Sequence, residues 1–138
     1  MDIQETQTYG PHLMLDCYGA PPEALSDVSL IFDFLDKLPS MIGMQKIGSP
    51  QIARFEDEAL AGVTGIIMIV TSHISIHTYA LKGCFFLDVF SCKPFEPAIV
   101  IAEVNKRFKP EHTNIAFVQR GFLFPTRNIH QSPKPKGA

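Results

Sequence analysis

The sequence predicts one α+β domain, a two-layer sandwich of mainly antiparallel sheet with two helices on one face. Three observations predict this class. Strand-like segments gather in the middle of the chain, two separate segments show the apolar spacing of a helix, and the length of 138 residues suits a single domain with a sizeable core. With 46% hydrophobic and 19% charged residues, the composition excludes a disordered protein.

The first elements follow a flexible leader, which we expect over residues 1–9. His12 to Tyr18 is a strand candidate, closed by the turn-forming residues 19–22. A helix is expected to begin near Pro22 or Ser26 and to end before Pro39, because proline disfavours the helical conformation of the residue preceding it. Its apolar residues recur every three or four positions, namely Leu25, Val28, Leu30, Ile31, Phe34 and Leu35.

Two strands are predicted before the most informative segment. Residues 51–56 form a short one, and Val63 to Val70 reads as a fully buried strand because residues 66–70 are continuously apolar.

The last elements are a second helix and a final strand. Pro94 and Pro97 mark the start of the helix, whose basic C-terminal end is Lys106-Arg107. Its inward residues are predicted to be Ile99, Val100, Ala102 and Val104. A strand is expected from Asn114 to Arg120. The domain would span residues 10–124, and residues 125–138 would form a flexible tail.

Charge, hydropathy and cysteine content limit the class of protein. The net charge of −2 gives no sign of a nucleic-acid partner, and no apolar run reaches the roughly 18 residues that span a membrane. The first residues lack the basic start of a signal peptide. Three cysteines, Cys17, Cys84 and Cys92, do not resemble a disulfide framework. We therefore expect a reduced cytoplasmic protein with neither membrane nor nucleic acid as partner.

The segments 72–78 and 84–92 predict a hairpin that gathers chemically active side chains. Strict alternation places His73, Ser75 and His77 on one face. With Lys82-Gly83 as a two-residue turn, the register pairs His73 with Cys92, Ser75 with Phe90 and His77 with Asp88. Titratable groups on one face of an otherwise apolar unit indicate a functional site.

Each of these residues also has a purely structural interpretation. An isolated serine at a strand start is usually a turn residue, and a cysteine is usually a small buried hydrophobe, as we expect for Cys17 and Cys84. His73 and His77 would lie about 13 Å apart on a strand, so we expect no metal site.

The hairpin resembles the processing site of the bacterial and archaeal S-adenosylmethionine decarboxylase proenzymes. Their signature, E/K-S-H-x-S-I-H-T-W-P-E followed by D-x-F-T-C, is similar to residues 71–81 and 88–92. Gly10-Pro-His-Leu13 is similar to the family's opening G-x-H-L, and Gly62-Val-Thr-Gly65 to its G-V-S-G. The resemblance extends over residues 10 to about 121.

The resemblance implies a pyruvoyl-dependent enzyme that cuts itself between Thr71 and Ser72. Ser72 would become the pyruvoyl group, which serves as the cofactor. His77 would be the base of the processing reaction, Thr64 would supply an assisting hydroxyl, and Cys92 would be the acid that reprotonates the product carbanion. The resemblance also implies a homodimer of processed protomers and a product used in the synthesis of spermidine and related polyamines.

Departures from the signature leave the substrate open. Tyr79-Ala80-Leu81 replaces Trp-Pro-Glu, whose glutamate is expected to hold the substrate ribose. Phe55, Tyr79 and Glu58 are the candidate substrate-binding residues that remain, with Glu56 as a second acidic candidate. S-adenosylmethionine leads as the substrate. Two alternatives are the same machinery acting on ornithine or arginine, and a non-processing homologue that serves as a binding or regulatory subunit.

Overall fold

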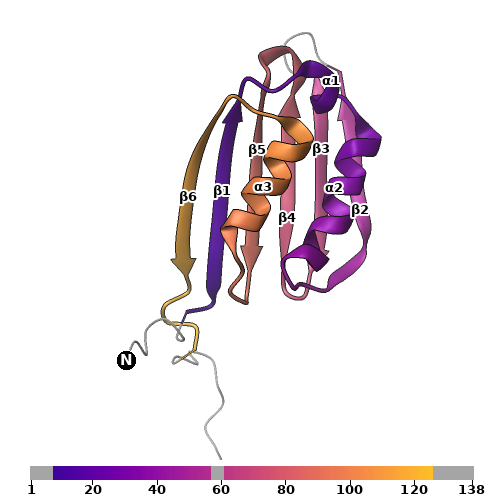
Figure 1. Ribbon diagram of the computed structural model, residues 1–138. Helices are drawn as coiled ribbons and strands as arrows, with labels where there is room; N and C mark the ends of the chain where they lie inside the picture. The colour runs from indigo at the N-terminus through magenta and orange to yellow at the C-terminus, as the bar shows by residue number, and fades with distance from the viewer. Residues whose placement is uncertain (1–7, 57–60, 126–138) are drawn as a thin grey trace, which may run out of the picture.

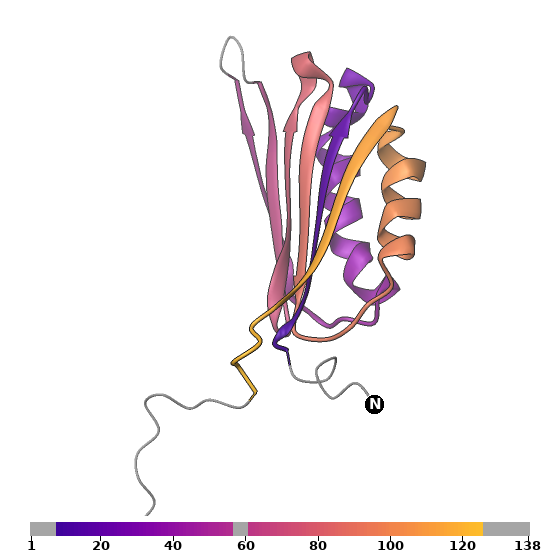
Figure 2. The ribbon, with the colours of Figure 1, turned by 90° about the vertical axis from the view of Figure 1, so that its left-hand side faces the viewer.

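The computed structural model describes residues 8–56 and 61–125, which form one antiparallel sheet with helices on a single face (Figure 1). The sheet has six strands in the order β2-β3-β4-β5-β1-β6. Figure 2 shows the sheet edge-on, with helices α2 and α3 on the same side of it. The elements are β1 (Gly10–Tyr18), α1 (Pro22–Leu25), α2 (Val28–Met41), β2 (Lys46–Phe55), β3 (Gly62–Ile69), β4 (Ser72–Tyr79), β5 (Cys84–Ser91), α3 (Pro97–Phe108) and β6 (His112–Arg120).

This architecture confirms the predicted two-layer α+β sandwich. The core lies between the sheet and the two long helices, where Phe34 of α2, Phe85 of β5 and Phe108 of α3 are fully buried. The ring of Phe108 lies 5.2 Å from that of Phe34 and 5.0 Å from that of Phe85, between centroids. No helix within the described ranges is long and apolar enough to cross a membrane.

The end of α2 differs from the prediction, because the helix runs through Pro39 to Met41. Pro39 has no N–H to donate to the carbonyl of Leu35, and only Ser40 and Met41 follow it in the helix. The carbonyls around it remain paired, since Ile42 N–H donates to Leu38 O and Met44 N–H donates to Pro39 O. The start of the predicted helix also splits in two, with Asp27 capping α2 by accepting a bond from Leu30 N–H.

The prediction that β3 is buried on both faces is wrong. Its residues alternate, with Ile67 and Ile69 buried under the helices and Ile66 and Met68 exposed by 37% and 54%. The apolar run is continuous, but helices cover only one side of the sheet. The face opposite the helices, here called the open face, therefore carries exposed apolar side chains.

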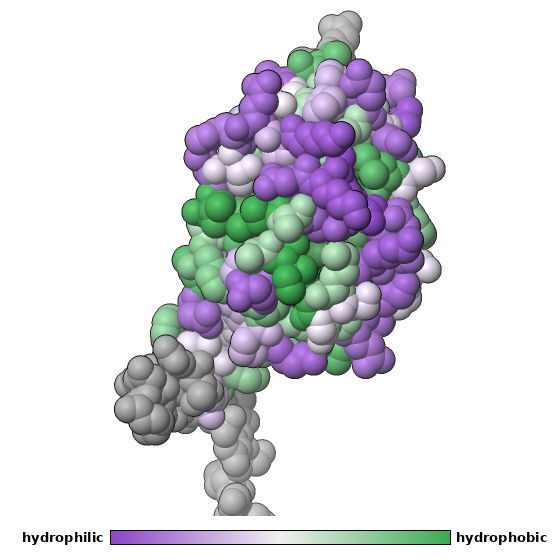
Figure 3. All heavy atoms as spheres, viewed as in Figure 1, coloured by the Kyte–Doolittle hydropathy of each residue, from purple (hydrophilic) through white to green (hydrophobic). Residues whose placement is uncertain are grey.

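The inward face of α3 was also predicted only in part. Val100 and Val104 are buried as expected, whereas Ile99 and Ala102 are exposed. In Figure 3, which shows the helix side, hydrophilic residues dominate the right-hand part over α2 and hydrophobic ones gather toward β6.

The predicted register of the β4–β5 hairpin is wrong by two residues. His73 lies opposite Phe90, Ser75 opposite Asp88 and His77 opposite Phe86. The connection is longer than a two-residue turn, because a 3₁₀ turn (Ala80–Lys82) precedes Gly83, whose φ of 62° is left-handed. A shift of two preserves the alternation, so His73, Ser75 and His77 still share the open face.

Candidate functional site

Ser72 is the first residue of β4 and has a backbone conformation that few residues other than glycine adopt. Its φ is 121°, in the region that L-residues rarely occupy. The hydroxyl of Tyr9 lies 2.8 Å from Ser72 Oγ and 2.7 Å from Thr71 Oγ1. Because Tyr9 falls in the segment expected to be a leader, sequence reasoning missed this contact. Unusual backbone conformations of this kind cluster at functional sites.

Cys92 contacts the Thr71–Ser72 bond through backbone and side chain. Its N–H donates to the Thr71 carbonyl oxygen at 3.3 Å, and Thr71 N–H donates to the Cys92 sulfur at 3.4 Å. Hydrogen bonding with Thr71, first through its side chain and then through its backbone N–H, lowers the pKa of the Cys92 thiol. The structure thus brings together Thr71, Ser72 and Cys92.

Phe90 is the centre of an aromatic and cationic cluster on the open face at this end of the sheet. Its ring centroid lies 5.3 Å from that of Tyr9, 5.1 Å from that of His12 and 5.9 Å from that of His73. The guanidinium carbon of Arg120 lies 4.3 Å above the same ring. The region beside Ser72 is therefore lined by packed aromatic rings.

His12 lies between Arg120 and Asp88 in this cluster. The Arg120 guanidinium lies 3.2 Å from His12 Nδ1 and can only donate, so Nδ1 accepts and Nε2 carries the proton. Nε2 is 3.7 Å from an Asp88 oxygen and makes no hydrogen bond among the described residues. Burial, opposed by Asp88 and reinforced by Arg120, lowers the pKa of His12 and favours the neutral ring.

Thr64 and His77 form a separate pair in the middle of the open face. They lie opposite one another on β3 and β4, with Thr64 Oγ1 3.2 Å from His77 Nδ1. His77 lies five positions after Ser72, which is about 16 Å along β4. One chain therefore brings Thr64 and His77 together but does not bring them to Ser72.

The candidate substrate residues lie at the far end of the sheet from Ser72. The rings of Phe55 and Tyr79 are 6.2 Å apart, and both side chains are half-buried. A hollow beside Phe55 has a volume of about 50 Å³, too small for a nucleoside. Glu58 lies outside the described residues. A larger cavity of about 280 Å³ lies beside Tyr9, Gly10 and Cys92.

Comparisons with known proteins agree with the fold and with the signature. The sequence model of the S-adenosylmethionine decarboxylase family matches residues 11–121. The crystal structure of the adenosylmethionine decarboxylase from Aquifex aeolicus has a TM-score of 0.72 at 24% identity, covering 93% of this chain and 99% of that one.

Two curated relatives are S-adenosylmethionine decarboxylase proenzymes. That of Methanococcus maripaludis is 33% identical over 115 residues, which is 83% of this chain and 91% of the relative. That of Thermococcus gammatolerans is 28% identical over 121 residues, 86% of this chain and 81% of the relative.

The sandwich fold and the extent of these matches define an enzyme of the decarboxylase class. The chain belongs to the S-adenosylmethionine decarboxylase family. These comparisons give no support to the ornithine or arginine alternative, or to a non-processing binding subunit.

Proposed function

We propose that this chain is a proenzyme that cleaves itself between Thr71 and Ser72 and then decarboxylates S-adenosylmethionine by means of a pyruvoyl group made from Ser72. The observation that carries the proposal is the arrangement around that bond in a chain of this family. The Ser72 hydroxyl is held by Tyr9, and the Thr71 carbonyl accepts the Cys92 N–H.

Self-processing would begin with attack of Ser72 Oγ on the Thr71 carbonyl carbon, converting the amide into an ester. Negative charge then develops on Thr71 O, where the Cys92 N–H stabilises it. Removal of the Ser72 α-proton by His77, assisted by Thr64, breaks the bond between Cβ and Oγ of residue 72 and releases residues 1–71 with a free Thr71 carboxylate. The dehydroalanine left at position 72 takes up water and loses ammonia to give the pyruvoyl end.

The residues around Ser72 suit decarboxylation after processing. The pyruvoyl group supplies an electron sink for the electrons released with carbon dioxide. Cys92, beside the cavity of about 280 Å³, supplies the proton that replaces the lost carboxylate. The decarboxylated product would serve polyamine synthesis in the cytoplasm.

A homodimer packed through the open face would complete this site. His77 is about 16 Å along β4 from Ser72 in its own chain, so the base must come from elsewhere. The open face exposes Ile66, Met68 and Phe86, by 37%, 54% and 37%. Burying these side chains against a second copy favours association. If the β4 strands of the two chains run antiparallel to each other, the His77 of one chain lies toward the Ser72 of its partner.

Intact-mass spectrometry of the purified chain tests the processing reaction. We expect two pieces under denaturing conditions, residues 1–71 and residues 72–138, the second with a pyruvoyl end in place of serine. A single chain of full mass after long incubation would contradict the proposal.

Mixing two inactive variants tests the shared site. Ser72→Ala lacks the nucleophile and His77→Ala lacks the base, so each alone should stay uncut or stall at the ester. When the two are refolded together, the Ser72→Ala partner supplies His77, and the His77→Ala chain should be cut. If it is cut no faster than alone, the site does not cross the dimer.

The substrate is tested by carbon dioxide release from S-adenosylmethionine, ornithine and arginine. In place of the glutamate of Trp-Pro-Glu, the ribose would be held by Glu56 or Glu58, and the sulfonium by the face of Phe55 or Tyr79. These residues lie at the far end of the sheet from Ser72 in one chain, so in the proposed dimer they would come from the partner subunit. We expect the highest kcat/KM with S-adenosylmethionine. A higher value for either free amino acid would overturn this assignment.

A further inference from the structure

Tyr9 is fixed in place by contacts that lie far apart in the sequence. Its N–H donates to Arg120 O at 2.8 Å and to Gly121 O at 3.1 Å, which adds it to the end of the β1–β6 pairing. Its ring lies against Phe90, and the Phe124 ring meets it edge-on at 5.1 Å. The position of the phenol oxygen is therefore set by backbone and ring together.

The phenol oxygen lies between the two hydroxyls that flank the bond to be cut. It is 2.7 Å from Thr71 Oγ1 and 2.8 Å from Ser72 Oγ. A phenol has one proton to donate and can accept a second bond. Thr71 stands where the family signature has glutamate or lysine, and its hydroxyl can accept the phenol proton.

We infer that Tyr9 is a positioning residue for self-cleavage, an inference that rests on the proposed function. It accepts a hydrogen bond from Ser72 Oγ while it donates to Thr71 Oγ1. This directs a lone pair of Oγ away from Tyr9 and fixes the side-chain rotamer before attack.

The step that Tyr9 prepares is a balanced acyl shift. A bond forms between Ser72 Oγ and the Thr71 carbonyl carbon, and the bond from that carbon to the Ser72 nitrogen breaks. The proton of the hydroxyl ends on the nitrogen, which becomes an amine. Tyr9 holds the nucleophile at one end of this exchange, while the Cys92 N–H binds the carbonyl oxygen at the other.

Tyr9→Phe tests the inference, because it removes the hydroxyl and keeps both ring contacts. We expect the conversion of full-length chain into the two pieces to slow roughly tenfold, the effect of losing one positioning hydrogen bond. Tyr18→Phe is the matched control, since Tyr18 lies at the opposite end of β1, and it should process at the wild-type rate. Equal rates for Tyr9→Phe and wild type would overturn the role of Tyr9.

Hydroxylamine, which cleaves esters, shows whether Tyr9 acts before or after the acyl shift. The uncut fraction of Tyr9→Phe should resist hydroxylamine because it remains an amide, whereas uncut His77→Ala should be cut because it stalls as the ester. Scission of the uncut Tyr9→Phe chain would show that Tyr9 acts after the acyl shift and would overturn the inference.

Thr71→Val tests the same contact without touching Tyr9. When the Thr71 hydroxyl is lost, the phenol proton turns toward Ser72 and weakens the nucleophile, so processing should slow. Combined with Tyr9→Phe, Thr71→Val should add no further slowing, because both changes act through one shared hydrogen bond. If the double variant instead slows by the product of the two single-variant factors, the inference is overturned. A wild-type chain that stays whole would instead overturn the proposed function itself.

Discussion

The two faces of the sheet differ in how their polar groups are paired. On the helix side, Thr78 is fully buried, and its hydroxyl donates to Leu25 O at 2.7 Å and accepts Val63 N–H at 2.9 Å. On the open face, the buried Nε2 of His12 has no hydrogen bond among the described residues, and at the nearby end of β4 the backbone of Ser72 is strained.

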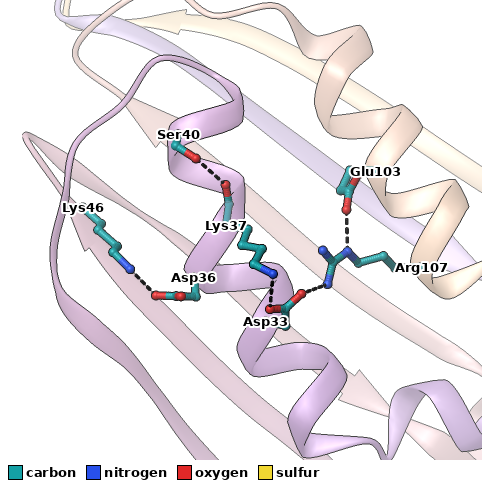
Figure 4. A network of polar contacts seen from close by, with 7 residues as sticks. All are labelled: Asp33, Asp36, Lys37, Ser40, Lys46, Glu103 and Arg107. Carbon is teal, nitrogen blue, oxygen red and sulfur yellow. Dashed lines mark hydrogen bonds and ion pairs between the residues drawn. The ribbon is translucent and has the colours of Figure 1, made fainter.

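The outer surface of the helix layer carries a network of ion pairs. Arg107 of α3 donates to Glu103 one turn earlier and to Asp33 of α2 at 2.7 Å (Figure 4). Asp33 also pairs with Lys37 at 3.0 Å. The pair between Arg107 and Asp33 links the two helices. One side of the sheet thus maintains the fold, while the other keeps groups available for chemistry.

The largest expected effect comes from Ser72→Ala at the start of β4. Without the hydroxyl there is no nucleophile, so self-cleavage should be abolished and the full-length chain should persist. Its melting temperature should match that of uncut wild-type chain, because only one partly exposed oxygen is lost. Mass spectrometry and thermal melting measure the two effects.

Ser75→Ala is the matched control for this prediction. Ser75 lies on the same strand, opposite Asp88, and has no assigned role in processing. It should cleave normally. Residual cleavage of Ser72→Ala at Thr71 would remove Ser72 from the mechanism.

Leu87→Ala on the helix side should lower the stability of the fold rather than remove a group needed for self-cleavage. Leu87 is 1% exposed, and its loss should lower the free energy of unfolding by about 2–5 kcal/mol through lost burial and the cavity left behind. Leu81→Ala makes the same change at a side chain 72% exposed, so its effect should stay within about 0.5 kcal/mol. Equal effects in urea unfolding would contradict the assignment of the core.

The sequence predicted the layers because alternation and helical spacing follow directly from burial on one side of each element. Register was harder to predict. Lys82-Gly83 has the composition of a two-residue turn, but the 3₁₀ turn before Gly83 adds residues, and only packing of the ends selects the longer connection. The end of α2 was predicted too early, because proline disfavours but does not forbid the helical conformation of the residue before it, and α2 continues through Pro39 to Met41.

Only those residues of the candidate site that lie close together in the sequence could be predicted. Ser72, His77 and Cys92 belong to one hairpin, so their motif is visible. Tyr9 precedes β1, which lies two strands from β4 with β5 between them, and no local pattern encodes its contact with Ser72. An apolar run such as residues 66–70 also cannot reveal whether a second layer covers it, which is why the open face was missed.

The two sides of the sheet should also differ in the reactivity of their cysteines, Cys17 and Cys92. Burial raises the pKa of Cys17 on the helix side to about 11, whereas hydrogen bonding with Thr71 lowers that of Cys92 from 9.0. At pH 8 a larger fraction of Cys92 than of Cys17 should be thiolate, and the Cys17 side chain is also fully buried, so alkylation by iodoacetamide should be faster at Cys92. Peptide mass spectrometry of the uncut Ser72→Ala chain measures both rates, and equal rates would contradict the difference.

The smallest expected effect is that of Asp33→Asn in the helix-side network. Hydrogen bonds from Arg107 and then Lys37 lower the pKa of Asp33 from its ordinary 3.8. A carboxylate with a lowered pKa stabilises the fold above its unfolded pKa and loses that contribution as pH falls through the folded value. The melting temperature of Asp33→Asn should therefore lie slightly below that of wild type near neutral pH, and the difference should shrink below about pH 3.8. Glu23→Gln, an exposed carboxylate of α1 outside this network, is the control. A difference that grows toward low pH would mean that the carboxylate of Asp33 does not stabilise the contact between α2 and α3.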